Sequence, residues 1–172
     1  MRILYLEASP GWGGQEMRIL KEAIGLKNRG HEIFMAIAAG GGLVAPARKA
    51  GFAVWEIKYT KAYWPRSFLR LWRIMRRQKI EVVNTHSSLD SWLGGLLARL
   101  LKIPIVRTRH LSTAIRAGWN SYLLYNKLAD QVVTTCQAIV PTIVRQARLP
   151  EKRCLSIPTG LDPLAVACSS AE

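Results

Sequence analysis

Short apolar runs alternate with segments of helical periodicity along almost the whole chain, and this alternation restricts the fold more than any other feature. Several runs are continuously apolar, as "RILYLE" at 2–7 is. A strand of that kind is buried on both faces, which is typical of a parallel sheet covered by helices on both sides. The pattern predicts strands at 2–7, 31–38, 52–57, 81–86, 104–109, 131–136 and 153–158.

The segments between these strands have apolar residues at helical spacing. They predict helices at 15–29, 43–50, 65–79, 89–101, 119–129 and 138–147. Gly30 and Gly51 follow the first two helices, where glycine is favoured after a helix C-terminus. The sequence therefore predicts one α/β domain, a Rossmann-like doubly wound, mostly parallel sheet with helices on both faces. In such sheets ligands bind at the carboxyl ends of the strands.

The composition fits a globular domain and argues against several other classes of protein. The length of 172 residues suits a single domain with its own core. No apolar run approaches the ~18 residues of a membrane-spanning helix, and the first residues do not resemble a secretory signal. The three cysteines form no CxxC pair, which argues against a disulfide framework or a zinc site. We therefore expect a cytoplasmic protein that needs no metal or other cofactor.

The positive charge is concentrated in one region. The formal net charge is +14, and the segment from Lys58 to Arg116 holds thirteen Lys or Arg residues against two acidic ones. A regional excess of this size indicates a polyanionic partner, which can be nucleic acid, anionic lipid headgroups or a phosphorylated substrate.

The helix predicted after Pro65 carries much of this charge. At about 100° per residue, one narrow arc of the helix holds Arg66, Arg70, Arg73 and Arg77. The opposite side holds Phe68, Leu71, Trp72 and Met75. Just upstream, Trp64 and two tyrosines are interleaved with lysines, as in segments that lie at a membrane interface. Two interpretations stay open: a solvated basic face, or contact with a membrane or another polyanion through the four arginines and Trp64.

A glycine cluster follows the first strand, in "ASPGWGGQE" at 8–16. It is not a dinucleotide fingerprint, because Glu16 stands where the last glycine would be, and no Gly-Lys-Ser/Thr follows for a P-loop. The loop precedes a helix N-terminus, whose N–H groups attract anions or polar oxygens. The cluster is either a tight turn or a place of close ligand approach by Gly13, Gly14, Gln15 and Glu16.

Polar residues follow two more strands. His86, Ser87 and Ser88 come after the fourth strand, and Arg109 and His110 come at the end of the fifth. Because the carboxyl ends of successive strands meet at one edge, we expect both histidines to face one crevice. Neutral histidine bonds sugar hydroxyls and protonated histidine pairs with phosphate, for which Arg109 is also suited. No HExxH motif and no carboxylate cluster is present, so a metal is not expected.

Four segments occur in an order that is similar to a known family. They are "ILYLEASPGWGGQE", "LKNRGHEIFMA", "EVVNTHSSLDSWLGGLLARLLKIPIVRTRH" and "KRCLSIPTGLD". Over residues 1–163 the chain resembles the N-terminal domain of GT-B glycosyltransferases, specifically those of the retaining family 4. The resemblance implies that Gly13 and Gly14 lie at an interdomain cleft and that His86 is a catalytic residue near the transferred sugar. It also implies that Arg109 and His110 line the acceptor side and that a hinge begins at residues 159–162.

The resemblance also implies a function. The expected reaction moves a sugar from a nucleotide-sugar donor to a lipid-linked or saccharide acceptor in cell-surface polysaccharide or lipopolysaccharide biosynthesis, at the inner face of the membrane. The family's donor-binding domain would follow residue 163, so we expect a short disordered tail at 164–172 and a chain that is inactive alone. The alternative is a non-catalytic basic module that binds anionic membrane or nucleic acid. Nucleic acid is the less expected partner, since no recognition motif for it is evident.

Overall fold

A seven-stranded sheet in the order β3-β2-β1-β4-β5-β6-β7, with every pairing parallel, forms the centre of the computed structural model. Its strands are β1 (Arg2–Glu7), β2 (Glu32–Ala38), β3 (Ala53–Ile57), β4 (Val82–Thr85), β5 (Ile105–Arg109), β6 (Gln131–Thr134) and β7 (Cys154–Ser156). The structure describes residues 1–111 and 115–160, so two of the predicted hinge residues, Leu161 and Asp162, and the predicted tail lie outside the described residues. The predicted Rossmann-like fold is confirmed, and its strand order reverses between β1 and β4.

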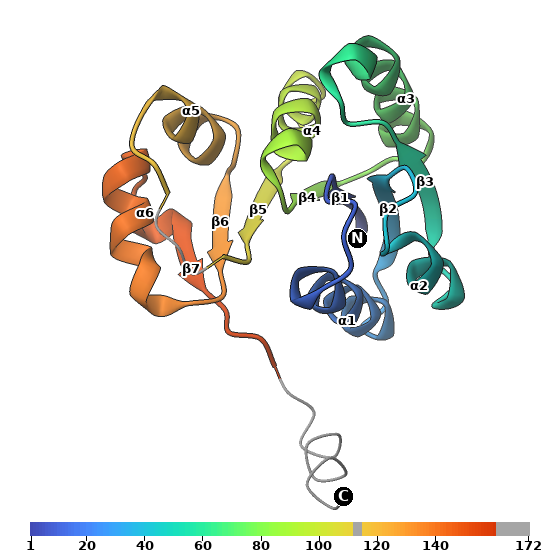
Figure 1. Ribbon diagram of the computed structural model, residues 1–172, viewed down its shortest axis with the longest axis horizontal. Coiled ribbons are helices and arrows are strands. Elements are labelled where there is room, and N and C mark those ends of the chain that lie inside the picture. The colour runs from blue at the N-terminus through green and yellow to red at the C-terminus, as the bar shows by residue number, and fades with distance from the viewer. Residues whose placement is uncertain (112–114, 161–172) are drawn as a thin grey trace, which may run out of the picture.

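Helices cover both faces of the sheet. Figure 1 shows α1 (Gly14–Asn28) and α2 (Val44–Lys49) on one face, opposite α3 (Trp64–Arg77), α4 (Ser88–Leu100) and α5 (Trp119–Ser121). The helix α6 (Val140–Ala147) lies beside β6 and β7. Short 3₁₀ turns are η1 (Lys61–Tyr63), η3 (Gln137–Ile139) and η4 (Glu151–Arg153). Gly30 and Gly51 end α1 and α2 with φ of +83° and +74°, as predicted.

The helix predicted at 119–129 is only partly α-helical. After the single turn of α5 the chain continues as the π-helix η2 (Tyr122–Lys127). The wider winding is visible in the 2.8 Å bond from the Leu128 N–H to the Leu123 carbonyl, five residues back. Helical periodicity in the sequence predicted a helix here but does not distinguish these two windings.

The core confirms that the sheet is buried on both faces. Successive residues of β1 point to opposite sides, so that Ile3 packs under α1 and α2 while Leu4 packs under α3 and α4. A third cluster joins α6 and η2 to the far strands through Leu124, Val132 and Ile143. The continuous apolar runs of the strands are explained by this two-sided burial.

The helix α3 exposes all four arginines of the predicted basic arc, and it buries Leu71, Ile74 and Met75 against the sheet. Trp72, which lies on the apolar side of the predicted helix, is not packed in the core: its side chain is 36% exposed, and its ring centroid lies 5.8 Å from the Arg76 guanidinium. Trp72 falls at the edge of the apolar side, where an indole reaches solvent. Trp64, by contrast, is half-buried against the core and donates its Nε1–H to the Tyr59 carbonyl at 3.0 Å. Among the described helices, none is long and apolar enough to cross a membrane.

Candidate functional site

A cavity of about 430 Å³ opens where the chain leaves β1 and β5, next to the point at which the strand order reverses. It is lined by Gly14, Gln15, Met17, Arg18, Lys21, His110, Leu111, Thr135 and Thr159. Three of these residues, Gly14, Gln15 and His110, were predicted as site residues from the sequence. The position agrees with the rule that ligands bind at the topological switch point of an open α/β sheet.

The two predicted histidines contact each other. His86 Nδ1 lies 2.9 Å from His110 Nε2, and the His86 ring stacks on Tyr5 with 5.3 Å between ring centroids. His86 is only 5% exposed and is not among the residues that line the cavity. His110 therefore faces the cavity, and His86 lies behind it and holds its ring in place.

Burial keeps both histidines neutral. It lowers the pKa of His86 well below its ordinary value, an effect that His110 and Arg107 reinforce. Burial, together with Arg18, also lowers the pKa of His110 to about 4. In a pair of neutral imidazoles one nitrogen donates and the other accepts, so one of the two outer nitrogens carries a proton and the other carries a lone pair. This pair suits hydroxyl groups better than it suits a phosphate, which would need a protonated ring.

The two outer nitrogens of the pair are unusual among buried polar atoms. His86 Nε2 and His110 Nδ1 are buried, and neither has a hydrogen-bond partner in the part of the chain that the structure describes. Buried polar atoms are rarely left without a partner, so a bound ligand or water is the natural complement for His110 Nδ1 beside the cavity.

The glycine loop ends at the N-terminus of α1 with no side-chain cap. Gly13 is the N-cap residue, with an extended φ of −164°. A Cβ built on Gly14 meets nothing within 4 Å, and one on Gly13 meets only the Glu16 carboxylate, at 3.6 Å. Neither glycine is required by packing or by a positive φ. At Gly14, which lines the cavity, the geometry therefore favours open space over a tight turn.

Two buried carboxylates position this loop. Glu7 accepts a bond from the Ser9 N–H at 2.7 Å and one from the Gln15 side chain at 2.6 Å. Asp90 accepts from the Ala8 N–H at 3.1 Å. Burial raises the pKa of Glu7, and the nearby charge of Asp90 raises it further. Burial also raises the pKa of Asp90. We did not predict a role for either residue, although a carboxylate that ends an apolar strand is an unusual enough signal to have suggested one.

Three other predicted residues are not among those that line the cavity. Glu16 is buried in the first turn of α1, close to Glu7. Ser87 caps α4, because its N–H and hydroxyl both donate to Asp90, and Ser88 is the exposed first residue of that helix. The roles predicted for them at a substrate stay predictions, but none of the three lines the cavity.

The cations that line the cavity, Arg18 and Lys21, both come from α1. Arg109 precedes His110 and points to the other side of the sheet, where it donates to the Tyr125 hydroxyl at 3.2 Å. Arg18 is buried beside the cavity instead, and it donates to Thr159 Oγ1 at 2.6 Å and to the Ile157 carbonyl at 2.8 Å. The sequence analysis missed Arg18, which lies three residues after Gln15 on the same face of the helix.

No group of three or more His, Cys, Asp and Glu side chains among the described residues is arranged to hold a metal ion. The expectation that the protein needs no metal is not tested by this observation and stays a prediction.

The fold and this cavity define an open α/β domain of the Rossmann type with a cavity at its topological switch point. A model of Glycosyltransferase Family 4 matches residues 12–163, and the chain belongs to this family. No curated protein sequence matches the chain.

Several solved structures share the fold. HepE from Anabaena, in complex with UDP-glucose, has a TM-score of 0.76 and 17% identity, with 94% of this chain and 44% of that chain covered. A glycosyltransferase from Rickettsia africae has a TM-score of 0.74 and 17% identity, with coverage of 98% and 49%. The lipopolysaccharide outer core galactosyltransferase WaaB has a TM-score of 0.67 and 11% identity, with 90% of this chain and 44% of that chain covered. The chain thus spans less than half the length of each of these GT-B proteins.

Proposed function

We propose that this domain is the acceptor-side half of a glycosyltransferase that moves a sugar from a nucleotide-sugar donor to a lipid-linked or saccharide acceptor in the assembly of cell-surface polysaccharide or lipopolysaccharide. The observation that carries the proposal is the cavity where neutral His110, the cations Arg18 and Lys21 and the N-terminus of α1 converge. Membership of Glycosyltransferase Family 4 supports the reaction class. The UDP-glucose complex of HepE supports the donor class, and the activity in the name of WaaB supports the acceptor class.

The chemistry of the cavity suits this reaction. The nucleoside diphosphate that leaves during transfer is an anion, which N–H groups at a helix N-terminus and nearby cations stabilise. The first turn of α1 and the guanidinium of Arg18 provide both at one wall of the cavity. The neutral His110 ring can hold a sugar hydroxyl on its Nδ1 atom without competing for the diphosphate. Catalysis by His86, which the family resemblance implies, would in this arrangement act through His110.

The test is a transfer assay on a protein in which residues 1–163 are joined to a donor-binding half from a family member. We expect transfer of labelled sugar from one member of a panel of UDP- and dTDP-sugars to a lipid-linked saccharide acceptor. We expect no turnover by the 172-residue chain alone, because a single domain gives the donor only one wall. Failure of the folded, joined protein to transfer any sugar of the panel would contradict the proposed reaction.

We further propose that α3 holds the domain at an anionic membrane surface, close to lipid-linked acceptors. The four arginines of the basic arc are exposed, and they flank apolar side chains that are also exposed, with Leu69 at 45% and Trp72 at 36%. Cations beside exposed apolar and aromatic groups are typical of segments that bind the membrane interface.

Vesicle binding tests this contact. The domain should bind vesicles of anionic lipid more tightly than neutral ones, with an affinity that falls as salt rises. A variant with all four arginines changed to Glu should lose most of this binding. The matched control reverses four exposed cations elsewhere, namely Arg29, Lys49, Lys127 and Lys152. Equal losses in both variants would mean that only net charge matters, and strong competition by RNA or DNA at physiological salt would favour a nucleic-acid partner.

A further inference from the structure

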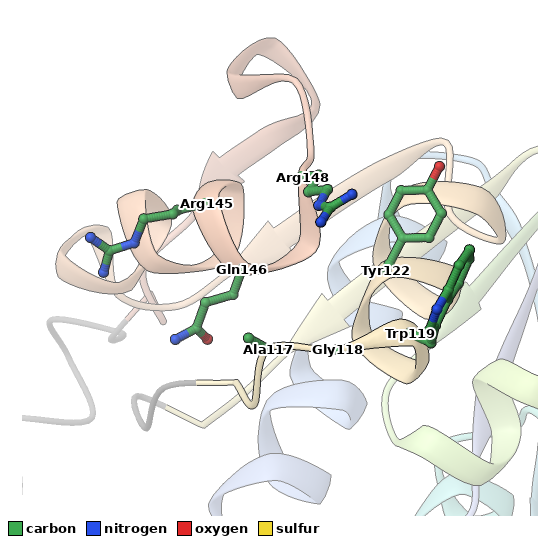
Figure 2. A pocket seen from close by; sticks show the side chains of 7 residues that line it. All are labelled: Ala117, Gly118, Trp119, Tyr122, Arg145, Gln146 and Arg148. Atoms are coloured by element: carbon green, nitrogen blue, oxygen red, sulfur yellow. The ribbon is translucent and has the colours of Figure 1, made fainter.

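A second cavity, of about 640 Å³, lies between the start of α5 and the end of α6. Its lining residues are Ala117, Gly118, Trp119, Tyr122, Arg145, Gln146 and Arg148. Figure 2 shows the rings of Trp119 and Tyr122 on one side of this space and the side chains of Gln146 and Arg148 on the other, with Arg145 at its outer end. Its volume lies within the range of ligand sites in proteins, and no role assigned above accounts for it.

The aromatic side of the cavity is unusually exposed. Trp119 is 76% exposed and contacts Tyr122 edge to face, with 5.6 Å between ring centroids. Trp and Tyr are enriched at binding interfaces, where the ring supplies apolar area and the N–H or O–H group a polar contact. The rings project from the junction between α5 and the π-helix η2, and π-helical segments are frequent at functional sites.

The opposite side of the cavity supplies charge and one acceptor. Arg145 and Arg148 are exposed, and neither forms an ion pair with a carboxylate among the described residues. Arg148 has a left-handed backbone, with a φ of +49°, at the C-cap of α6. Gln146 Oε1 is buried and has no hydrogen-bond partner in the described part of the chain. The cavity thus offers two guanidinium groups for an anion and one carbonyl oxygen for a hydroxyl donor.

We infer that this cavity binds an anionic saccharide, such as an acidic sugar unit of the acceptor. The apolar faces of a sugar ring pack on Trp119 and Tyr122, a carboxylate or phosphate group pairs with the arginines, and a ring hydroxyl donates to Gln146. His110 lines the first cavity, and Gly118, eight positions later in the chain, lines the second. The inference rests on the proposed function, since it identifies the chemical class of the acceptor.

Calorimetric titration of the 172-residue chain tests the inference with three probes, which are an oligogalacturonate, a neutral malto-oligosaccharide of equal length and inorganic phosphate. We expect the acidic oligosaccharide to bind more tightly than both others and to quench the fluorescence of Trp119. Trp119→Ala and the double variant R145Q/R148Q should each weaken that binding roughly tenfold or more. The double variant K49Q/K152Q removes the same charge from exposed positions outside both cavities and α3, and it should leave the binding unchanged.

Two results would overturn the inference. One is an oligogalacturonate affinity that is undetectable or unaffected by Trp119→Ala. The other is an affinity that K49Q/K152Q lowers as much as R145Q/R148Q, or that phosphate alone reproduces, because charge and not a saccharide site would then explain it. The transfer assay of the joined protein measures sugar transfer to a lipid-linked acceptor, whereas the titration measures binding of a free acidic oligosaccharide. A failed titration beside successful transfer therefore rejects only the acidic acceptor, and failed transfer rejects the proposed function.

Discussion

Replacing His110 by alanine in the joined, donor-competent protein is expected to lower the rate of sugar transfer by roughly 100-fold, the usual scale for a positioned catalytic imidazole. His110 is the histidine that lines the cavity, and its Nδ1 atom has no partner among the described residues. Its loss should also lower the free energy of unfolding by roughly 1–3 kcal/mol, because it leaves the buried His86 Nδ1 atom without its partner. Transfer kinetics and thermal unfolding, measured on the same preparation, separate the two effects.

His86→Ala is the companion variant, and we expect it to reduce both transfer and stability. The substitution removes a buried ring that stacks on Tyr5, and it leaves His110 Nε2 without its partner. An unsatisfied buried polar group lowers the free energy of unfolding by roughly 1–3 kcal/mol, and the void left by the removed ring lowers it further. The third histidine, His31, directly precedes β2 and does not line the cavity, so His31→Ala serves as the control and should change neither property greatly. Full transfer by His110→Ala would contradict the assignment of the site.

The sequence was sufficient to predict the sheet because its strands are buried on both faces. Each of the seven strands lies within a predicted run, and β1 has the predicted bounds. Continuous apolar runs separated by segments of helical periodicity allow few alternative folds. In a Rossmann-like sheet the ligand site is expected at the carboxyl ends of the strands, near residues 7–16, 86–90 and 109–112. The cavity at Gly14 and His110 agrees with that placement.

What the sequence did not predict depends on contacts between distant segments. The family resemblance implied that Arg109 and His110 both line the acceptor side, but consecutive residues at a strand end point to opposite sides, and the pattern did not show which of them faces α1. The support of the glycine loop by Asp90 joins residues 82 positions apart. From the sequence, Arg18 is indistinguishable from an ordinary cation on a helix surface. Its position at the cavity is evident only from its hydrogen bonds to Ile157 and Thr159.

The glycine loop is fixed partly by a second glycine turn. The N–H of Gly42 donates to the Pro10 carbonyl at 3.1 Å, so the turn after β2 packs directly on the loop. A Cβ built on Gly42 would lie 2.6 Å from the Trp12 Cβ and 2.9 Å from the Gly11 carbonyl oxygen. Backbone atoms cannot move aside as a side chain can by rotation. Glycine is therefore required at 42 by close packing, whereas at 14 it is not.

These two glycines give the most direct test of what the loop is for. Gly42→Ala should push the loop away from the turn and lower the free energy of unfolding by ~1–3 kcal/mol, as overpacking does. Gly14→Ala should leave the melting temperature nearly unchanged, because its Cβ meets nothing within 4 Å and no positive φ is involved. The same Cβ projects at the edge of the cavity, so we expect Gly14→Ala to abolish transfer in the joined protein by occupying ligand space. Unfolding curves and transfer rates for both variants check this opposite pattern.

A Gly14→Ala protein that keeps both its stability and its full transfer rate would show that no ligand approaches the backbone there. The glycine cluster would then serve only to pack the loop against the turn at Gly42.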